Sequence, residues 1–124
     1  KRAGNALNAV VNPAIMETVS GRCAHLAASG EDIVIVEAAL LGENGKREPW
    51  LTGLILVLCP EELRVHRLTT DRAMNTEEAR RRIQAQTPPE SKRAIAGWVI
   101  ENSGDIANLH DQVEAIAEVL RNAD

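Results

Sequence analysis

The sequence predicts a single α/β domain with a mostly parallel sheet. Two apolar runs, residues 33–36 and 54–58, lack the alternation of half-exposed strands and are typical of strands buried on both faces. A third short run, residues 98–100, alternates with helical segments along the chain. Strands that alternate with helices indicate parallel neighbours. A chain of 124 residues is long enough to bury one core of this kind.

Residues 1–28 are predicted to be helical with an interruption at Asn12 and Pro13, because asparagine is favoured at the N-cap and proline at the first helical position. Beyond that point, four residues recur at helical spacing and predict a buried stripe: Ile15, Val19, Cys23 and Leu26. Ser29 and Gly30 should end the helix. A strand over residues 33–36 and a turn-rich loop over residues 42–45 follow.

The second half of the chain carries clear helix signals. Pro60, followed by two acidic residues, suits the first turn of a helix after the second strand. Asn75 and Glu78 resemble a capping box and predict a new helix that runs to Gln86. A short helix is expected around residues 90–96. The last helix has an apolar stripe: Ile106, Leu109, Val113, Ile116 and Leu120.

Composition excludes several classes of function. The chain has two Trp but no Phe or Tyr, so it lacks the aromatic platforms of proteins that bind single-stranded nucleic acid. A net charge of −4 argues against a general DNA-binding face. Cys23 and Cys59 show no metal or redox spacing, and no signal peptide or membrane-spanning run is present. We therefore expect a soluble, cytoplasmic protein without nucleic-acid or membrane partners.

Positive charge gathers in residues 61–93, which hold eight of the 14 basic residues against six acidic ones. Such a cluster in an acidic chain predicts a local anion site, and phosphate is the usual anion. The alternative is a solvated helix face with i,i+4 pairs such as Glu78 with Arg82. The pattern favours a solvated helix face more strongly for the run from Arg80 to Arg82 than for Arg67 and Arg72.

Polar residues follow each predicted strand, where ligands bind in parallel α/β sheets. Glu37 and Glu43 come after the first strand, the turn at Cys59 after the second, and Asn102 after the third. Glu37 could hold a metal-bound water or orient a substrate hydroxyl, or it could cap the following turn. Asn102 could contact a ligand or serve only the turn before Gly104. The three histidines have no partner at ligand spacing.

The order of these motifs resembles the dephospho-CoA kinase family. The motifs are VEAALLGE at residues 36–43, Arg67 with Arg72, RIQAQ at residues 82–86, Lys92, and VIENSG at residues 99–104. The family transfers the γ-phosphate of ATP to the ribose 3′-hydroxyl of dephospho-CoA, the last step of coenzyme A synthesis. Its usual strand-end motif, Asp-x-Pro-Leu-Leu-Phe-Glu, is changed here at positions 37, 39 and 42.

The resemblance implies a catalytic role for Glu37, beside Mg²⁺ and the acceptor ribose. It implies that Leu40, Leu41 and Glu43 lie on the dephospho-CoA side. It also implies a lid over about residues 67–97, which closes over the nucleotide.

For ATP, the resemblance implies that Arg72 reaches the phosphates from the lid with support from Arg67. Gln86 would belong to the closing helix of the lid, and Asn102 would border the adenine pocket. An arginine on a closing lid suits phosphoryl transfer, which depends on electrostatic stabilisation.

The family begins with a strand and a GxxxxGK[ST] phosphate loop, and the 124 residues contain no such motif. We expect a parallel-sheet P-loop kinase-like domain that lacks its N-terminal phosphate-loop strand and belongs to a longer kinase. The alternative is a non-catalytic remnant that binds a nucleotide or a partner. The family's strand order, 2-3-1-4-5, would place the lacking strand between residues 33–36 and 54–58.

Overall fold

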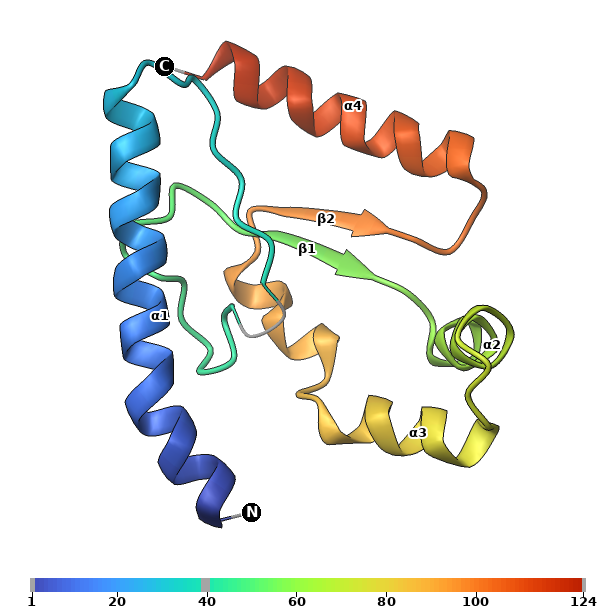
Figure 1. The fold of residues 1–124 in the computed structure, drawn as a ribbon. Coiled ribbons are helices and arrows are strands. Elements are labelled where there is room, and N and C mark those ends of the chain that lie inside the picture. Colours follow the sequence, from blue (N-terminus) through green and yellow to red (C-terminus); the bar gives the residue numbers. More distant parts are fainter. Residues whose placement is uncertain (1, 39–40, 124) are drawn as a thin grey trace. The chain divides into compact units, whose positions relative to one another are not determined.

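The computed structural model describes residues 2–38 and 41–123, with side chains from Pro13 onward. The chain forms two compact units, residues 1–37 and 38–124 (Figure 1). The first unit holds helix α1 (Arg2–Ala28) and an extended segment. The second unit holds both strands and the remaining helices, so the parallel sheet is built within it.

Helix α1 runs through Pro13 without a break, so the predicted interruption is wrong. Proline has no backbone N–H to donate within the helix, and its ring crowds the carbonyl four residues before it. The helical turns before and after Pro13 nevertheless form one helix. The predicted end is confirmed. Gly30 has φ 93°, and the Glu31 amide donates to the Leu26 carbonyl at 3.3 Å, the bond that closes a Schellman motif.

Residues 33–36 are extended but form no strand, contrary to the sequence prediction. Ile33 is 39% exposed and Ile35 is 71% exposed. A strand needs a hydrogen-bonded neighbour, and none of the described residues pairs with this segment. The apolar run therefore has the composition of a strand but no neighbouring strand among the described residues.

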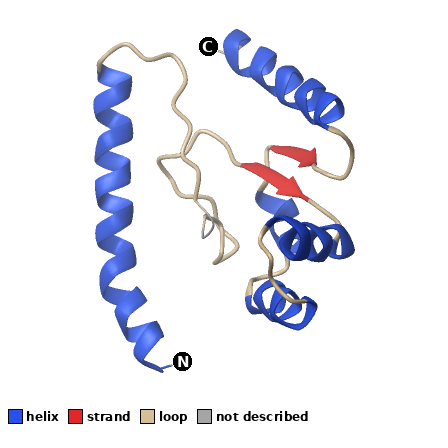
Figure 2. Cartoon of the chain, turned by 45° about the vertical axis from the view of Figure 1, so that its right-hand side comes forward, coloured by secondary structure: helices blue, strands red, loops and turns tan. Residues whose placement is uncertain are grey.

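The sheet consists of β1 (Ile55–Leu58) and β2 (Trp98–Glu101), which pair in parallel from Ile55↔Trp98 to Leu58↔Glu101. Both strands were predicted. The bonds of the Trp98 amide to the Leu54 carbonyl at 3.3 Å and of the Asn102 amide to the Leu58 carbonyl at 2.7 Å frame the ladder. Figure 2 shows the two strands side by side, each followed by a helix on its carboxyl side.

Four helices complete the second unit, and their bounds follow the sequence signals. They are α2 (Glu61–Asp71), α3 (Thr76–Ala85), the 3-10 helix η1 (Pro89–Ile95) and α4 (Ile106–Asn122). The Asn75 side chain caps α3 by accepting from the Glu78 amide at 2.8 Å, as predicted. Asp105 caps α4 in the same way through the Asn108 amide at 2.8 Å.

The core of the second unit lies between the sheet and these helices. Its buried apolar residues come from both strands, from α2, α3 and α4, and from the loop before β1: Leu41, Leu54, Leu56, Leu58, Val65, Ala79, Ile100 and Ile116. The predicted stripe on α4 is only partly buried, because Ile116 is covered whereas Ile106 is 81% exposed. Gln112 fastens α4 to β2 by accepting from the Glu101 amide and donating to its carbonyl, at 2.8 and 2.9 Å.

The connection from α2 to α3 contains a strained residue. Ala73 has φ 52°, the left-handed conformation that costs an L-residue with a Cβ about 1 kcal/mol. Ala73→Gly should therefore raise the free energy of unfolding by about 0.5–1 kcal/mol, although glycine also gains freedom in the unfolded chain. Urea denaturation measures this. Ala115→Gly, in the exposed middle of α4, is the control and should lose about 1 kcal/mol; an equal loss at Ala73 would contradict the prediction.

Candidate functional site

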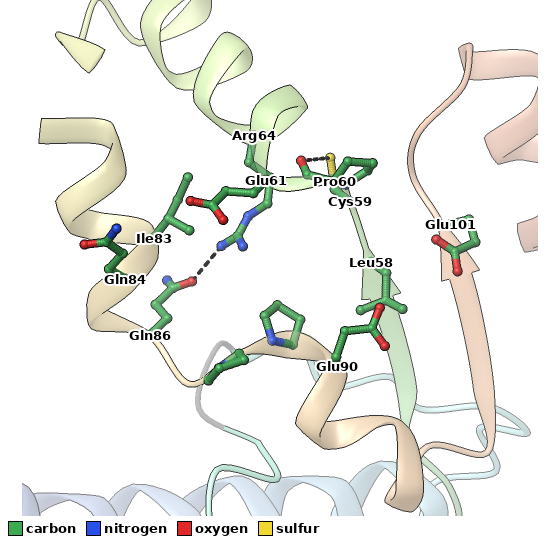
Figure 3. Close-up of a pocket in the computed structure, with 12 residues that line it drawn as sticks. Leu58, Cys59, Pro60, Glu61, Arg64, Ile83, Gln84, Gln86, Glu90 and Glu101 are labelled. Carbon is green, nitrogen blue, oxygen red and sulfur yellow. Dashed lines mark hydrogen bonds between the residues drawn. The ribbon is translucent and has the colours of Figure 1, made fainter. Parts of the chain in front are cut away.

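The carboxyl end of β1 opens into a cavity of about 520 Å³ (Figure 3). Its lining comes from the ends of β1 and β2, the start of α2, the end of α3 with the segment that follows it, and η1. The lining residues are Leu58, Cys59, Pro60, Glu61, Arg64, Ile83, Gln84, Gln86, Pro88, Pro89, Glu90 and Glu101. The cavity thus lies at the sheet edge where parallel α/β proteins bind ligands, between the two helices of the predicted lid.

Arg67 connects α2 to the ends of both strands. Its Nη1 donates to the Asn102 carbonyl at 3.2 Å and to the Cys59 sulfur at 3.5 Å. Two positions that the sequence analysis placed at the carboxyl edge of the sheet, Cys59 and Asn102, therefore lie together at Arg67. The contact to Asn102 uses its backbone, which fixes the turn after β2.

Arg64 lies one turn before Arg67 on α2 and points into the cavity (Figure 3). Its Nη2 donates to Oε1 of Gln86 at 3.0 Å, which joins α2 to the segment after α3. Gln86 was predicted to belong to the site, whereas Arg64 was missed. The signal was present: residues three apart on a helix share a face, so Arg64 had to follow Arg67 toward the strand ends.

Two arginines of α3, Arg80 and Arg82, form ion pairs with carboxylates, unlike Arg64 and Arg67 of α2. Arg80 pairs with Glu62 at 3.0 Å across to α2, and Arg82 pairs with Glu78 at 3.3 Å along its own helix. The hydrogen bond from Arg80 holds the pKa of the Glu62 carboxyl below its usual value. For Arg80 and Arg82 the surface-pair alternative is therefore correct.

Arg72 follows the last turn of α2, beside Ala73, and its side chain is exposed. No other described residue holds it in place, so its charge is open to a ligand.

The Glu43 carboxylate is bound by two side chains of the second unit. Its carboxylate forms a 2.7 Å ion pair with Lys92 of η1 and accepts a hydrogen bond from the Thr87 hydroxyl. The Lys92 side chain is only 12% exposed, so this pair is partly shielded from water. The hydrogen bond from Lys92, followed by that from Thr87, lowers the pKa of the Glu43 carboxyl. The loop that carries Glu43 is thus fastened to the 3-10 helix.

Glu43→Gln should lower the free energy of unfolding by about 1–3 kcal/mol, because it replaces the partly shielded ion pair with Lys92 by a weaker contact to a neutral amide. Urea denaturation at neutral pH measures this loss. Glu114→Gln is the matched control, because its pair with Arg121 has both side chains 61% exposed and should change stability by no more than about 0.5 kcal/mol.

The Glu43 effect should depend on pH with a fixed sign. A carboxyl whose pKa is lower in the folded chain stabilises it fully above the ordinary value of 4.5 and loses this effect as the pH falls through the folded pKa. The stability difference between the unchanged chain and Glu43→Gln should therefore shrink on acidification below 4.5. A difference that stays constant would mean that the carboxylate charge has no part in it.

The remaining predicted site residues are placed as follows. Glu37 is the last residue of the first unit, and its side chain is exposed. Leu41 is 8% exposed and belongs to the core of the second unit. Leu40 lies outside the described residues.

The described residues hold no group of three or more His, Cys, Asp or Glu side chains arranged for a metal ion. Magnesium in phosphoryl-transfer sites is bound by one or two carboxylates together with substrate phosphates and water. A single exposed carboxylate such as Glu37 fits that donor set. In the same part of the chain, no helix is long and apolar enough to cross a membrane.

Comparison with known proteins decides the family. The profile described as dephospho-CoA kinase matches residues 1–108. The chain belongs to the dephospho-CoA kinase family. It is 37% identical to dephospho-CoA kinase of Thermus thermophilus over 111 aligned residues. These residues cover 90% of this chain and 53% of that protein. It is 32% identical over 115 residues to dephospho-CoA kinase of Arabidopsis thaliana, at 93% and 49% coverage.

A solved structure agrees with the sequence comparison. The crystal structure of TT1252 from Thermus thermophilus superposes with a TM-score of 0.73 at 35% identity, over 94% of this chain and 59% of that one. The fold class predicted from the sequence, a partial P-loop kinase-like α/β domain, is confirmed. The chain spans about half the length of the curated relatives that it matches.

Proposed function

We propose that this chain is the acceptor-binding and lid-bearing part of an enzyme that transfers the γ-phosphate of ATP to the 3′-hydroxyl of dephospho-CoA. The observation that carries the proposal is the family match over residues 1–108. The cavity at the carboxyl edge of the parallel sheet supports it, because phosphoryl transfer is catalysed mainly by positioning and electrostatics at such an edge. The reaction is proposed for the cytoplasm.

The roles of the chain's own residues follow from this reaction. Glu37 would take the proton of the acceptor hydroxyl and lie beside Mg²⁺, which would offset negative charge on the transferred phosphate. Residues 67–97 would form the lid, with Arg72 on the phosphates. Asn102 would border the adenine, and its backbone contact to Arg67 supports a fixed turn there.

Acceptor binding is proposed for the loop of Leu40, Leu41 and Glu43. The ion pair of Glu43 with Lys92 favours a supporting role for this carboxylate, which would hold the loop in position beside the acceptor. Gln86 would act at the closing end of the lid.

The open edge of β1 supports a further strand in the complete enzyme. Carbonyls of Leu54 and Leu58 accept from β2, so the groups of Ile55 and Val57 point to the other edge, because successive residues of a strand alternate. Val57 is also 53% exposed, so the face of β1 that carries its side chain is open to water in the described part of the chain. We propose that the phosphate-loop strand pairs with this edge.

The proposal is tested with a chimera in which the phosphate-loop segment of a full-length relative precedes Lys1. The chimera should convert dephospho-CoA and ATP to coenzyme A, measured by chromatography of the product. The 124 residues alone should give none, because they lack the backbone donors and lysine that cradle the phosphates. Turnover by the chain alone, or a folded but inactive chimera, would contradict the proposal.

A further inference from the structure

Two arginines on one face of α2 carry charge that no carboxylate offsets. Arg64 donates to the amide oxygen of Gln86, and Arg67 donates to a carbonyl and a thiol sulfur. In the described part of the chain, neither guanidinium forms an ion pair. A guanidinium never loses its charge in a protein, so both present a fixed positive charge at the carboxyl edge of the sheet.

The carboxylates that line the same cavity have cationic partners of their own. Arg93 lies between Glu90, at 2.8 Å, and Glu101, at 3.4 Å. Glu61 lies 3.9 Å from Arg80. The lining residue whose charge remains available to a ligand is therefore Arg64.

The partner of Arg64 is one that an anion can replace. The bond to Gln86 joins a charged donor to a neutral amide oxygen, whereas a phosphate oxygen would bring the opposite charge to the same donor. A guanidinium also offers two parallel donors to phosphate oxygens, of which this bond uses one. Both groups lie at the wall of a cavity of about 520 Å³, which has room for a diphosphate.

We propose that Arg64 is a phosphate-binding residue of this cavity, held by Gln86 until a diphosphate group replaces the amide. The inference rests on the proposed function, because a diphosphate is common to ATP and dephospho-CoA. It adds an arginine of α2 to the phosphate contact proposed for Arg72, which follows that helix. Arg67 stays bound to the strand ends and supports the helix face.

The experiment titrates the 124-residue chain with inorganic pyrophosphate by isothermal calorimetry at low salt. We expect binding with a Kd on the order of millimolar, weakened about tenfold in Arg64→Met, because one charge-assisted contact is lost. Arg121→Met removes the same charge from an exposed site on α4 and should leave the Kd unchanged. Equal weakening in both variants, or no binding by the unchanged chain, would overturn the proposal.

Two substitutions at Gln86 test the exchange of partners. Gln86→Glu should weaken pyrophosphate binding, because a carboxylate competes for Arg64. Gln86→Ala should leave binding equal or tighter, because no bond has to break. A loss of binding in Gln86→Ala that matches Arg64→Met would assign the contact to Gln86 instead. Tryptophan fluorescence during thermal unfolding confirms that each variant is folded.

Titrations with ATP and with dephospho-CoA identify which diphosphate the cavity takes. The Arg64→Met effect should appear with one of them at the same size as with pyrophosphate. Its absence with both, while pyrophosphate still shows it, would limit the site to an adventitious anion and overturn the proposal. An inactive chimera, by contrast, would refute the proposed function and leave the pyrophosphate result intact.

Discussion

Arg72→Ala in the chimera is expected to lower kcat by about two to three orders of magnitude, the usual loss for one electrostatic contact to a transition state. Arg72 is exposed at the end of α2 and has no partner among the described residues. The proposed function assigns this charge to the transferred phosphate. Steady-state kinetics with ATP and dephospho-CoA measure the effect.

Stability should change little in the same variant, by no more than about 0.5 kcal/mol, because the side chain is exposed. Arg81→Ala is the matched control, since it removes the same charge from an exposed position on α3. Its kcat should stay within about twofold of the unchanged chimera. A fall in melting temperature with kcat intact would instead make Arg72 a structural residue.

Glu37→Gln should have an effect of similar size, a loss of about 10²- to 10⁴-fold in kcat, if this carboxylate accepts the proton of the acceptor hydroxyl. Glutamine keeps the shape of the side chain and removes its charge. The residue is exposed in the first unit, so its replacement should leave the melting temperature unchanged.

Glu37→Asp tests whether activity depends on the charge of the carboxylate or on the length of the side chain that carries it. The family motif has aspartate at this position, and the substitution draws the carboxylate back by one methylene. We expect the Asp variant to keep at least the activity of the unchanged chimera, because the charge remains. Full activity in Glu37→Gln would exclude Glu37 as the base.

Strands of the second unit were predictable because each combines an apolar run with flanking turn residues. Residues 33–36 show the limit of that reasoning. Four β-branched residues in a row supply the propensity for a strand, but the ladder needs a neighbour that local sequence cannot supply. Pro13 shows a second limit, because a local helix-breaking signal did not end α1.

The site was predictable where it depended on strand ends and not where it depended on helix packing. Cys59 and Asn102 both contact Arg67 because both lie at the carboxyl edge of the sheet. The bond between Arg64 and Gln86 joins residues 22 positions apart and requires the angle between α2 and α3. The Glu43 pair with Lys92 likewise bridges a loop and a 3-10 helix, and no periodicity in the sequence connects them.

Amide exchange at the open edge of β1 tests most directly whether the chain is part of a larger P-loop kinase sheet. In the 124-residue chain, the amides of Ile55 and Val57 should exchange quickly, because they point away from β2. In the chimera both should become protected about as strongly as the amides of β2, because the phosphate-loop strand pairs with them. Protection in the chimera would support the account; rapid exchange at both amides in a folded, active chimera would contradict it.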